Sequence, residues 1–348
     1  MQDRSDGLLS RLAEGPVICA EGYLFEFERR GYLQAGAFVP EVVLEHPELV
    51  RQVHEEFVHA GSDVVEAFTY YAHREKLRLI GKEQLLEQIN RQALDIAGEV
   101  ARRHGALLAG DICNTNLFDP EDRQVRSVVR SMFEEQVGWA VEAGADFIIG
   151  ETFSWAQEAL LALEVIRETG LPAVVTLAIH REPVTREGWT PAEACKRLEE
   201  GGAAVVGLNC IRGPRTMLPL LAPIREAVNC AVAALPVPYR TRQEEPSFQS
   251  LTDPECDLIP GDRPFPTALD PFTCNRFELG AFALAARELG IEYLGVCCGA
   301  GPHHIRAVAE ALGRTPPASR YSPDMSHHAF LGTHPSLKQR NLDYASRL

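Results

Sequence analysis

Short apolar runs alternate with longer amphipathic stretches along most of the chain. Each short run is a near-continuous series rich in Val, Ile and Ala, which is the pattern of a parallel strand buried on both faces. Eight such runs are predicted to be strands: 17–20, 63–68, 107–112, 147–151, 173–179, 205–210, 231–237 and 293–297.

The stretches between these runs have the spacing of amphipathic helices. Thr190, Pro191 and Glu193 show typical helix-start chemistry, with a capping side chain before a first-turn proline. Eight helices are predicted: 40–60, 82–104, 122–143, 155–169, 191–200, 214–228, 272–289 and 302–312.

Eight strand–helix pairs predict an α/β fold, a (β/α)8 barrel, with a doubly wound open sheet as the alternative. We expect a single barrel domain over residues 1–313 and a polar tail over 314–348 that packs on the barrel or on a second copy in a homo-oligomer. The long loop 238–271 would lie on the catalytic face as a lid or substrate wall, or it is a plain surface insertion.

The formal net charge of −15 disfavours binding to nucleic acid or to anionic membranes, so a small-molecule substrate is expected. No run approaches the ~18 consecutive apolar residues of a membrane span. The first residues, MQDRSDGLLSRLAEG, carry charges where a secretory signal has an apolar segment, which favours the cytoplasm.

Three of the nine cysteines fall at predicted strand ends, where barrel active sites are built. Cys210 closes the sixth strand, and Cys297 and Cys298 close the eighth. Neighbouring side chains on a regular strand point to opposite faces, but the glycines at 299 and 301 let the chain turn and bring both sulfurs together. Three thiolates would leave one of the four positions on Zn²⁺ open. The alternative is that these cysteines are buried small apolar residues.

The other cysteines are assigned to packing or to the surface, although Cys113 lies near the end of the third strand. They are Cys19, Cys113, Cys195, Cys230, Cys256 and Cys274. An odd number of cysteines without secretory features argues against a disulfide framework.

An open zinc position suggests a thiol substrate, because the metal stabilises a thiolate far more than a thiol. Methyl transfer to that thiolate from a positively charged donor removes charge in the transition state. A water-poor pocket beside the metal would therefore favour the reaction.

The strings GLNC and GVCCGAGPHHIRAVAEAL resemble the two zinc signatures of the homocysteine S-methyltransferases. RRGYLQAGAFVPE, LEHPELVRQ and HAGSDVVEAFTYYAHREKL resemble the betaine–homocysteine enzymes in particular, and the likeness runs over residues 19–312. The resemblance implies a barrel, zinc on the three cysteines, homocysteine as methyl acceptor and methionine as product.

Some of the family's substrate-binding residues are present in this chain, and others are replaced. Glu151 matches the acidic residue that holds the amino group of homocysteine. Ala20 stands where the family has a second carboxylate, and Glu21 beside it is the candidate replacement.

Phe38, Tyr71 and Thr152 stand where the betaine enzyme surrounds its donor with Trp, Tyr and Tyr, and Thr69 is a further expected substrate contact. The loss of one ring weakens cation–π attraction of ~0.5 to 2 kcal/mol per contact. A sulfonium donor such as S-methylmethionine is therefore considered beside betaine.

Phe153, Trp155 and Tyr70 are candidates for the missing ring. His303 and His304 are expected to begin a helix and not to bind metal. Two other functions stay open: zinc–thiol methyl transfer with another acceptor thiol or a corrinoid-protein partner, and a non-catalytic zinc or thiol protein.

Overall fold

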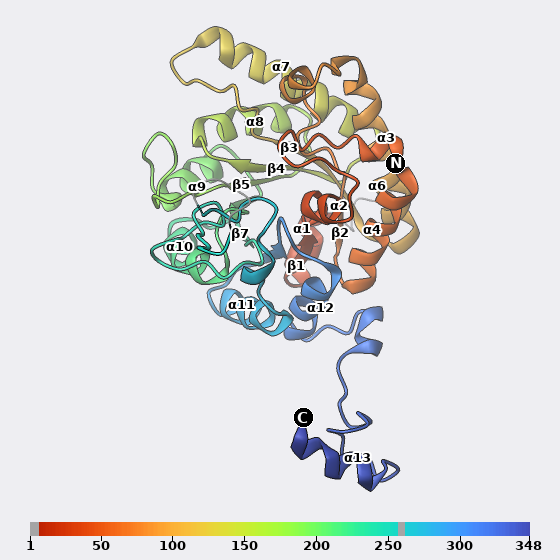
Figure 1. Ribbon diagram of the computed structural model, residues 1–348. Helices are drawn as coiled ribbons and strands as arrows, with labels where there is room; N and C mark the ends of the chain where they lie inside the picture. Colours follow the sequence, from red (N-terminus) through yellow and green to blue (C-terminus); the bar gives the residue numbers. More distant parts are fainter. Residues whose placement is uncertain (1–6, 257–261) are drawn as a thin grey trace.

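Eight parallel strands close into a barrel in the computed structural model, which describes residues 7–256 and 262–348 (Figure 1). Each strand pairs with the next along the chain, and the last pairs with the first through Val17 and Tyr293. This closure confirms the (β/α)8 barrel and excludes the open sheet. The strands are β1 (Val17–Ala20), β2 (Val64–Glu66), β3 (Leu107–Cys113), β4 (Phe147–Phe153), β5 (Ala173–Leu177), β6 (Val205–Asn209), β7 (Ala231–Leu235) and β8 (Tyr293–Val296).

Most of the helices surround the barrel on its outside (Figure 1). They bury one face against the strands, as the amphipathic pattern predicted. The helices of the barrel are α1 (Leu8–Glu14), α2 (Tyr23–Arg29), α3 (Val42–Glu45), α4 (Pro47–Ala60), α5 (Arg74–Leu79), α6 (Leu86–His104), α7 (Arg123–Glu142), α8 (Ala156–Glu168), α9 (Pro191–Glu200), α10 (Pro214–Ala227), α11 (Arg276–Glu288) and α12 (Pro302–Ala311).

Three predicted helices have different bounds. The predicted helix 82–104 begins only at Leu86, after the 3-10 turn η2 (Glu83–Leu85). The predicted helix 40–60 is divided into α3 and α4 at His46, because proline at position 47 disfavours helical geometry in the residue before it. The predicted helix 272–289 begins only at Arg276, where the Asn275 side chain caps it, after a short turn η3 (Asp270–Phe272). The short helices α1, α2 and α5 were not predicted.

Strand alternation divides the core into an inner and an outer part. Cys19 of β1 packs inside the barrel with Val64 and Tyr293, whereas its neighbour Ala20 packs outward against the helices. Leu8 of α1 joins the inner cluster and is fully buried. The next inward position after Cys19 is Glu21, so a polar layer lies above the apolar one at the C-terminal end of the barrel.

The loop between β7 and α11 folds back across this end. The Phe248 amide donates to the Ile211 carbonyl oxygen at 2.8 Å, which fixes part of the loop beside β6. Residues 257–261 of the predicted 238–271 loop lie outside the described residues.

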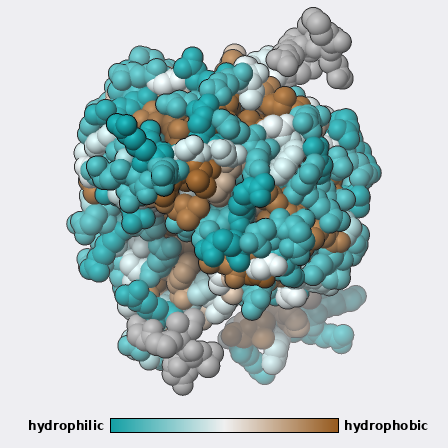
Figure 2. Space-filling view, turned by 90° about the horizontal axis from the view of Figure 1, so that it is seen from above, coloured by the Kyte–Doolittle hydropathy of each residue, from teal (hydrophilic) through white to brown (hydrophobic). Residues whose placement is uncertain are grey.

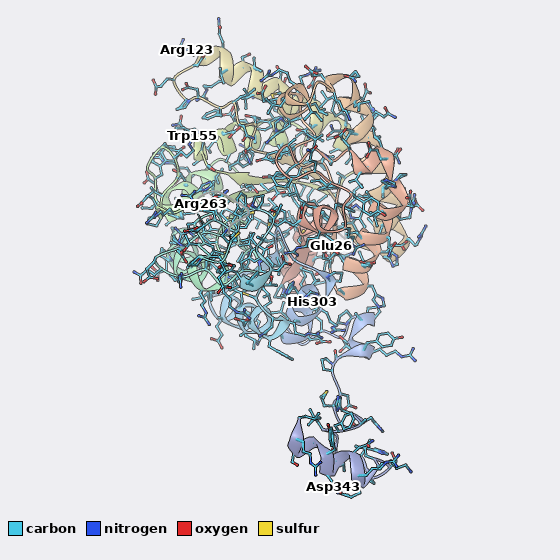
Figure 3. The ribbon with its side chains drawn as sticks, viewed as in Figure 1. Glu26, Arg123, Trp155, Arg263, His303 and Asp343 are labelled. Atoms are coloured by element: carbon cyan, nitrogen blue, oxygen red, sulfur yellow. The ribbon has the colours of Figure 1, made fainter. Side chains whose placement is uncertain are left out.

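The tail divides into a packed part and an extended part. The turn η4 (Pro317–Tyr321) packs on α4 and α12. Farther on, α13 (Gln339–Tyr344) and η5 (Ala345–Arg347) lie apart from the barrel in Figure 1, and Asp343 of α13 is labelled there in Figure 3. The domain boundary at 313 and the homo-oligomer stay predictions.

The outer surface is mainly hydrophilic on the face in Figure 2, with patches of hydrophobic residues between. Over 7–256 and 262–348, every helix is too short or too polar to cross a bilayer.

Candidate metal centre and substrate cavity

Three cysteine sulfurs meet at the C-terminal end of the barrel. Cys210 follows β6 directly, and Cys297 and Cys298 follow β8. Their sulfur atoms all lie within 4.8 Å of one another, and none of the three is in a disulfide. The structure therefore brings together the thiols that the sequence singled out.

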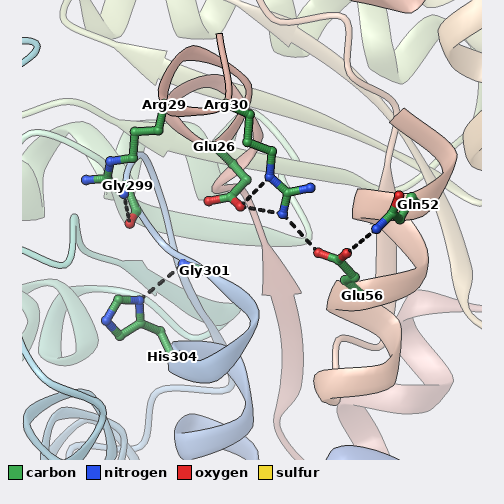
Figure 4. A network of polar contacts seen from close by, with 8 residues as sticks. All are labelled: Glu26, Arg29, Arg30, Gln52, Glu56, Gly299, Gly301 and His304. Atoms are coloured by element: carbon green, nitrogen blue, oxygen red, sulfur yellow. Dashed lines mark hydrogen bonds and ion pairs between the residues drawn. The ribbon is translucent and has the colours of Figure 1, made fainter. Parts of the chain in front are cut away.

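The turn after β8 is held by α2 and by the loop after β7. Gly299 has a left-handed φ of +94°, and a Cβ there would overlap the buried Tyr239 hydroxyl. Arg29 donates to the Gly299 carbonyl oxygen at 3.0 Å, as Figure 4 shows, and to the Tyr239 hydroxyl at 2.7 Å. These contacts require glycine at 299 and hold the two adjacent cysteines in a bend instead of a strand.

His304 stabilises the same turn from the start of α12. The Gly301 amide donates to its Nδ1 at 3.1 Å (Figure 4), and its Nε2 lies 3.0 Å from the Cys274 carbonyl oxygen. Both ring nitrogens are used in the fold, as expected for a helix-start residue.

Two of the three thiols stabilise a negative charge on the third. The pKa of Cys210 is lowered well below its ordinary value because the Cys297 and Cys298 thiols donate to its sulfur. Burial raises the pKa of Cys297, and the hydrogen bond to Cys210 raises that of Cys298. A cluster that stabilises a thiolate in this way is a good soft-metal site.

Asn209, the residue before Cys210, links the thiols to two buried carboxylates. Its side-chain amide donates to Glu151, to the Thr152 hydroxyl at 2.9 Å and to Glu21 at 3.3 Å. The side-chain oxygen Oδ1 of Asn209 accepts a hydrogen bond from the backbone amide of Thr152 at 2.9 Å. One amide therefore fixes the positions of both carboxylates beside the sulfurs.

Both carboxylates are harder to ionise than exposed ones. Burial, followed by the charge of Cys210, raises the pKa of Glu151 to about 8. Burial and the charge of Glu151 raise the pKa of Glu21. A substrate ammonium group between them would restore the ionised form of both.

A cavity of about 550 Å³ opens above Cys210 and Cys298. Eight of the twenty residues that line it are aromatic, and much of the remaining wall is polar. His180 lies there between Ser154 at 2.9 Å and Gln249 at 3.0 Å, so the loop after β7 forms one side of the cavity. The aromatic lining residues are Phe25, Phe38, Tyr70, Tyr71, Phe118, Trp155, Phe248 and Phe265.

Strained backbone gathers around this cavity. Among the described residues, the non-glycine positions with left-handed φ are, apart from Asp262, all cavity-lining residues. Such conformations cost roughly 1–3 kcal/mol each and persist at ligand sites. They are Phe38 (φ 56°), Tyr71 (60°), Asn116 (63°), Thr152 (59°), Cys210 (55°) and Ile211 (56°).

Comparison with known proteins gives the family. The model of the homocysteine S-methyltransferase family matches residues 22–312. The chain belongs to this family. It is 37% identical over 321 residues to the S-methylmethionine–homocysteine S-methyltransferase of Rattus norvegicus, covering 90% of this chain and 84% of the relative. It is 38% identical over 317 residues to the betaine–homocysteine S-methyltransferase 1 of Xenopus laevis, covering 88% and 75%.

The fold agrees with this assignment. The metallated form of the homocysteine methyltransferase MmuM from Escherichia coli matches with a TM-score of 0.67 at 16% identity, covering 86% of this chain and 98% of that one. This likeness shows the barrel that the sequence predicted, and membership of the family makes the protein a methyltransferase.

The residues expected to contact substrates fall into two groups at different depths in this methyltransferase. Phe38, Tyr71 and Thr152 line the large cavity, while Glu21 and Glu151 lie below it beside Cys297.

Thr69 is buried, its hydroxyl donates to the Asp111 carbonyl oxygen at 2.7 Å, and it lies outside the residues that line the cavity. Of the three replacement rings, Tyr70 and Trp155 line the cavity, whereas Phe153 is fully buried in the outer core against Phe133. Trp155 is labelled in Figure 3.

Tyr71 already has a cation on its ring. The Lys76 ammonium lies 3.9 Å from the ring centroid, and the Tyr70 ring packs against it at 4.2 Å. A donor cation has less of this ring available than the aligned position alone indicated.

Sequence reasoning missed Asn209, Glu66 and Asp111. The two carboxylates are buried at inward positions on β2 and β3. The sequence feature that could have identified these two carboxylates is a charged residue inside an otherwise apolar run that is typical of a buried strand.

The remaining cysteines pack in the fold as free thiols, and Cys230 alone of them is partly exposed. Cys113 accepts a hydrogen bond from the Tyr71 amide at 3.3 Å.

Proposed function

We propose that this protein transfers a methyl group from an onium donor to the sulfur of homocysteine and forms methionine, with zinc bound by Cys210, Cys297 and Cys298. The observation that carries the proposal is the convergence of three sulfurs at the floor of an aromatic cavity. Three soft ligands suit zinc and leave a position for a substrate.

When bound, zinc would lower the pKa of the incoming thiol, so that the substrate sulfur is a thiolate at neutral pH. In the transfer step a sulfur–methyl bond forms while the bond between that methyl group and the donor nitrogen or sulfur breaks. The bonding pair stays on the donor, which leaves as a neutral amine or thioether.

The buried carboxylates beside the sulfurs would orient the acceptor. Glu151 and Glu21 accept the substrate ammonium, and Asn209 holds both in place. The aromatic wall would surround the donor cation and exclude water, which favours a step that removes charge.

The residues that line the large cavity are the basis for proposing the methyl donor. Thr152 offers no ring, and Lys76 covers part of Tyr71, so the enclosure of a trimethylammonium group is incomplete. We expect S-methylmethionine to support faster methionine formation than betaine. A panel of S-methylmethionine, betaine and dimethylsulfoniopropionate, with homocysteine and zinc-replete protein, measures this order.

A matched pair of cysteine variants tests the role of the metal. Cys298→Ala should lose zinc and lower methionine formation at least about 100-fold, since even outer-shell changes at metal sites cost 10–100-fold. Cys230→Ala, a partly exposed cysteine outside the cluster, should keep both. Failure of every donor with zinc-replete protein would contradict the proposed reaction.

A further inference from the structure

The large cavity has a polar side in addition to its aromatic rings. This side comes from the ends of β4 and β5 and from the loop after β7, and it includes Ser154, His180, Arg186 and Gln249. Among the described residues that line the cavity, Arg186 is the only arginine or lysine, in a chain with a formal net charge of −15. The thiols, the acceptor carboxylates and the aromatic rings give this cation no role.

The loop that carries Arg186 is attached to the start of α8. The Arg186 amide donates to the Ser154 carbonyl oxygen at 2.9 Å. The Glu187 carboxylate accepts from the Ala156 amide at 3.1 Å and from the Gln157 amide at 2.8 Å. These contacts hold the backbone of Arg186 at the cavity, and none of them uses the Arg186 side chain.

The Arg186 guanidinium lies over the Trp155 ring, 4.8 Å from its centroid. In the described part of the chain, no carboxylate forms an ion pair with it. Glu158, which also lines the cavity, accepts instead from the Thr115 amide and hydroxyl. A guanidinium that a ring orients and no anion neutralises is suited to bind the carboxylate of a ligand.

Gln249 supplies a second donor on the same side of the cavity. His180 Nδ1 lies 3.0 Å from Gln249 Oε1, and because an amide oxygen only accepts, Nδ1 carries the proton. In the neutral ring, His180 Nε2 then accepts from the Ser154 hydroxyl at 2.9 Å. The side-chain oxygen of Gln249 is therefore held by His180, and its NH2 group is left to donate to a ligand.

We propose that Arg186 and Gln249 bind the carboxylate of the methyl donor and make the enzyme selective for onium compounds that carry a carboxylate. The inference rests on the proposed function and assigns residues to the recognition of its donor. Aromatic rings for the cation and a guanidinium for the anion complement a zwitterion. The guanidinium can offer two parallel N–H donors to one carboxylate, and the Gln249 amide adds a third.

Binding of two matched sulfonium compounds tests the inference without methyl transfer. Dimethylsulfoniopropionate and (3-hydroxypropyl)dimethylsulfonium both carry a dimethylsulfonium group, but only the first has a carboxylate. Isothermal titration of zinc-replete protein without homocysteine should give a dissociation constant about tenfold lower for the carboxylate compound, because charge-assisted hydrogen bonds are strong. Equal dissociation constants for the two compounds would overturn the inference.

Variants of Arg186 assign the preference to its side chain. Arg186→Gln should weaken binding of the carboxylate compound about tenfold and leave binding of the alcohol unchanged. Arg186→Lys should keep part of the preference, since lysine retains the charge without the planar pair of donors. Arg181→Gln, exposed on the same loop and outside the cavity lining, is the matched control. Equal weakening of both compounds in Arg186→Gln would show that Arg186 only supports the loop.

Steady-state kinetics separate the carboxylate of the donor from that of homocysteine. With dimethylsulfoniopropionate as donor, Arg186→Gln should raise the KM for the donor about tenfold and leave the KM for homocysteine unchanged. Gln249→Leu should raise the KM for the donor by a smaller factor, about threefold, because a neutral amide contributes less. A rise confined to the KM for homocysteine would assign the anion to the acceptor and overturn the inference.

Failure of this inference is distinguishable from failure of the proposed methyl transfer. The titrations contain no homocysteine, so they report the carboxylate preference whether or not methionine forms. Methionine formation without a carboxylate preference would contradict the role of Arg186 alone. A carboxylate preference that depends on Arg186, without methionine formation, would contradict the proposed reaction while the carboxylate site stands.

Discussion

Asn209 shows how one residue connects the two halves of the site. Its side-chain amide donates to the carboxylates of Glu21 and Glu151 and, at 3.9 Å, to the sulfur of Cys297. The string GLNC drew attention to its cysteine, whereas the asparagine looked like an ordinary strand-end residue. Only the closed barrel shows that Asn209 faces Glu21 and Glu151 across the interior.

Asn209→Ala should raise the KM for homocysteine about 10–100-fold with a smaller change in kcat, because the carboxylates lose their orientation while the thiolates remain. Steady-state kinetics with the preferred donor and elemental analysis for zinc check this expectation. Asn229→Ala, on the exposed surface before β7, serves as the control. A loss of zinc equal to the loss of activity would contradict the assigned role.

At the scale of elements, the eight strands could be predicted because each is buried on both faces and reads as an apolar run. The missed helix α2 is buried at Tyr23, Leu24, Phe25 and Phe27, so it lacks the one-sided pattern on which a helix prediction depends. The cysteines could be located at strand ends from sequence alone. The hydrogen bond from Arg29 to Gly299 in the turn after Cys298 joins residues 270 positions apart and could not be predicted.

The turn after β8 can be tested with two glycines of similar backbone geometry. Gly299 has φ +94° and Gly144 has φ +80°, but an added Cβ meets Tyr239 at the first and nothing within 4 Å at the second. Both alanine variants should lose about 1 kcal/mol of stability from the left-handed conformation.

Gly299→Ala should in addition lower zinc affinity at least tenfold, because the side-chain overlap displaces Cys298. Competition with a zinc chelator measures this affinity. Equal zinc affinity in the two variants would show that the turn does not position the thiols.

Helix α8 carries a buried carboxylate with a predictable pH effect. Burial raises the pKa of Glu158 to about 7 from an ordinary 4.5, although the Thr115 amide and hydroxyl both donate to it. The folded state then holds a proton that the unfolded state releases, so stability falls as pH rises from about 4.5 to about 7.

Glu158→Gln should remove this fall and gain roughly 3 kcal/mol relative to the unmodified chain between pH 4.5 and pH 8. Urea unfolding across this range measures the difference. Glu164→Gln, on the exposed face of the same helix, should leave the pH dependence unchanged. Parallel curves for Glu158→Gln and the unmodified chain would contradict the pKa assignment.

At the scale of the whole molecule, the start of the tail is part of the barrel and its end is not. Arg314 donates to the Asp63 carboxylate and to the Pro16 carbonyl oxygen, which joins the beginnings of β1 and β2. Ser322 still donates to Glu310 of α12, whereas α13 and η5 lie apart from the barrel (Figure 1).

Arg314→Ala should therefore lower the free energy of unfolding by about 1 kcal/mol, whereas removal of residues 323–348 should leave it unchanged within error. Urea unfolding compares the two. If the end of the tail is the contact of the predicted homo-oligomer, light scattering should show a smaller species for the truncated chain. A truncated barrel that no longer folds would contradict this division of the tail.

The central claim is that Cys210, Cys297 and Cys298 hold one zinc ion with a position left for the substrate sulfur. Zinc X-ray absorption, measured without and with homocysteine, tests it most directly. The account predicts three sulfur neighbours and one lighter atom without substrate, and four sulfur neighbours with it. An unchanged set of neighbours in the presence of saturating homocysteine, or fewer than three sulfurs at the start, would contradict it.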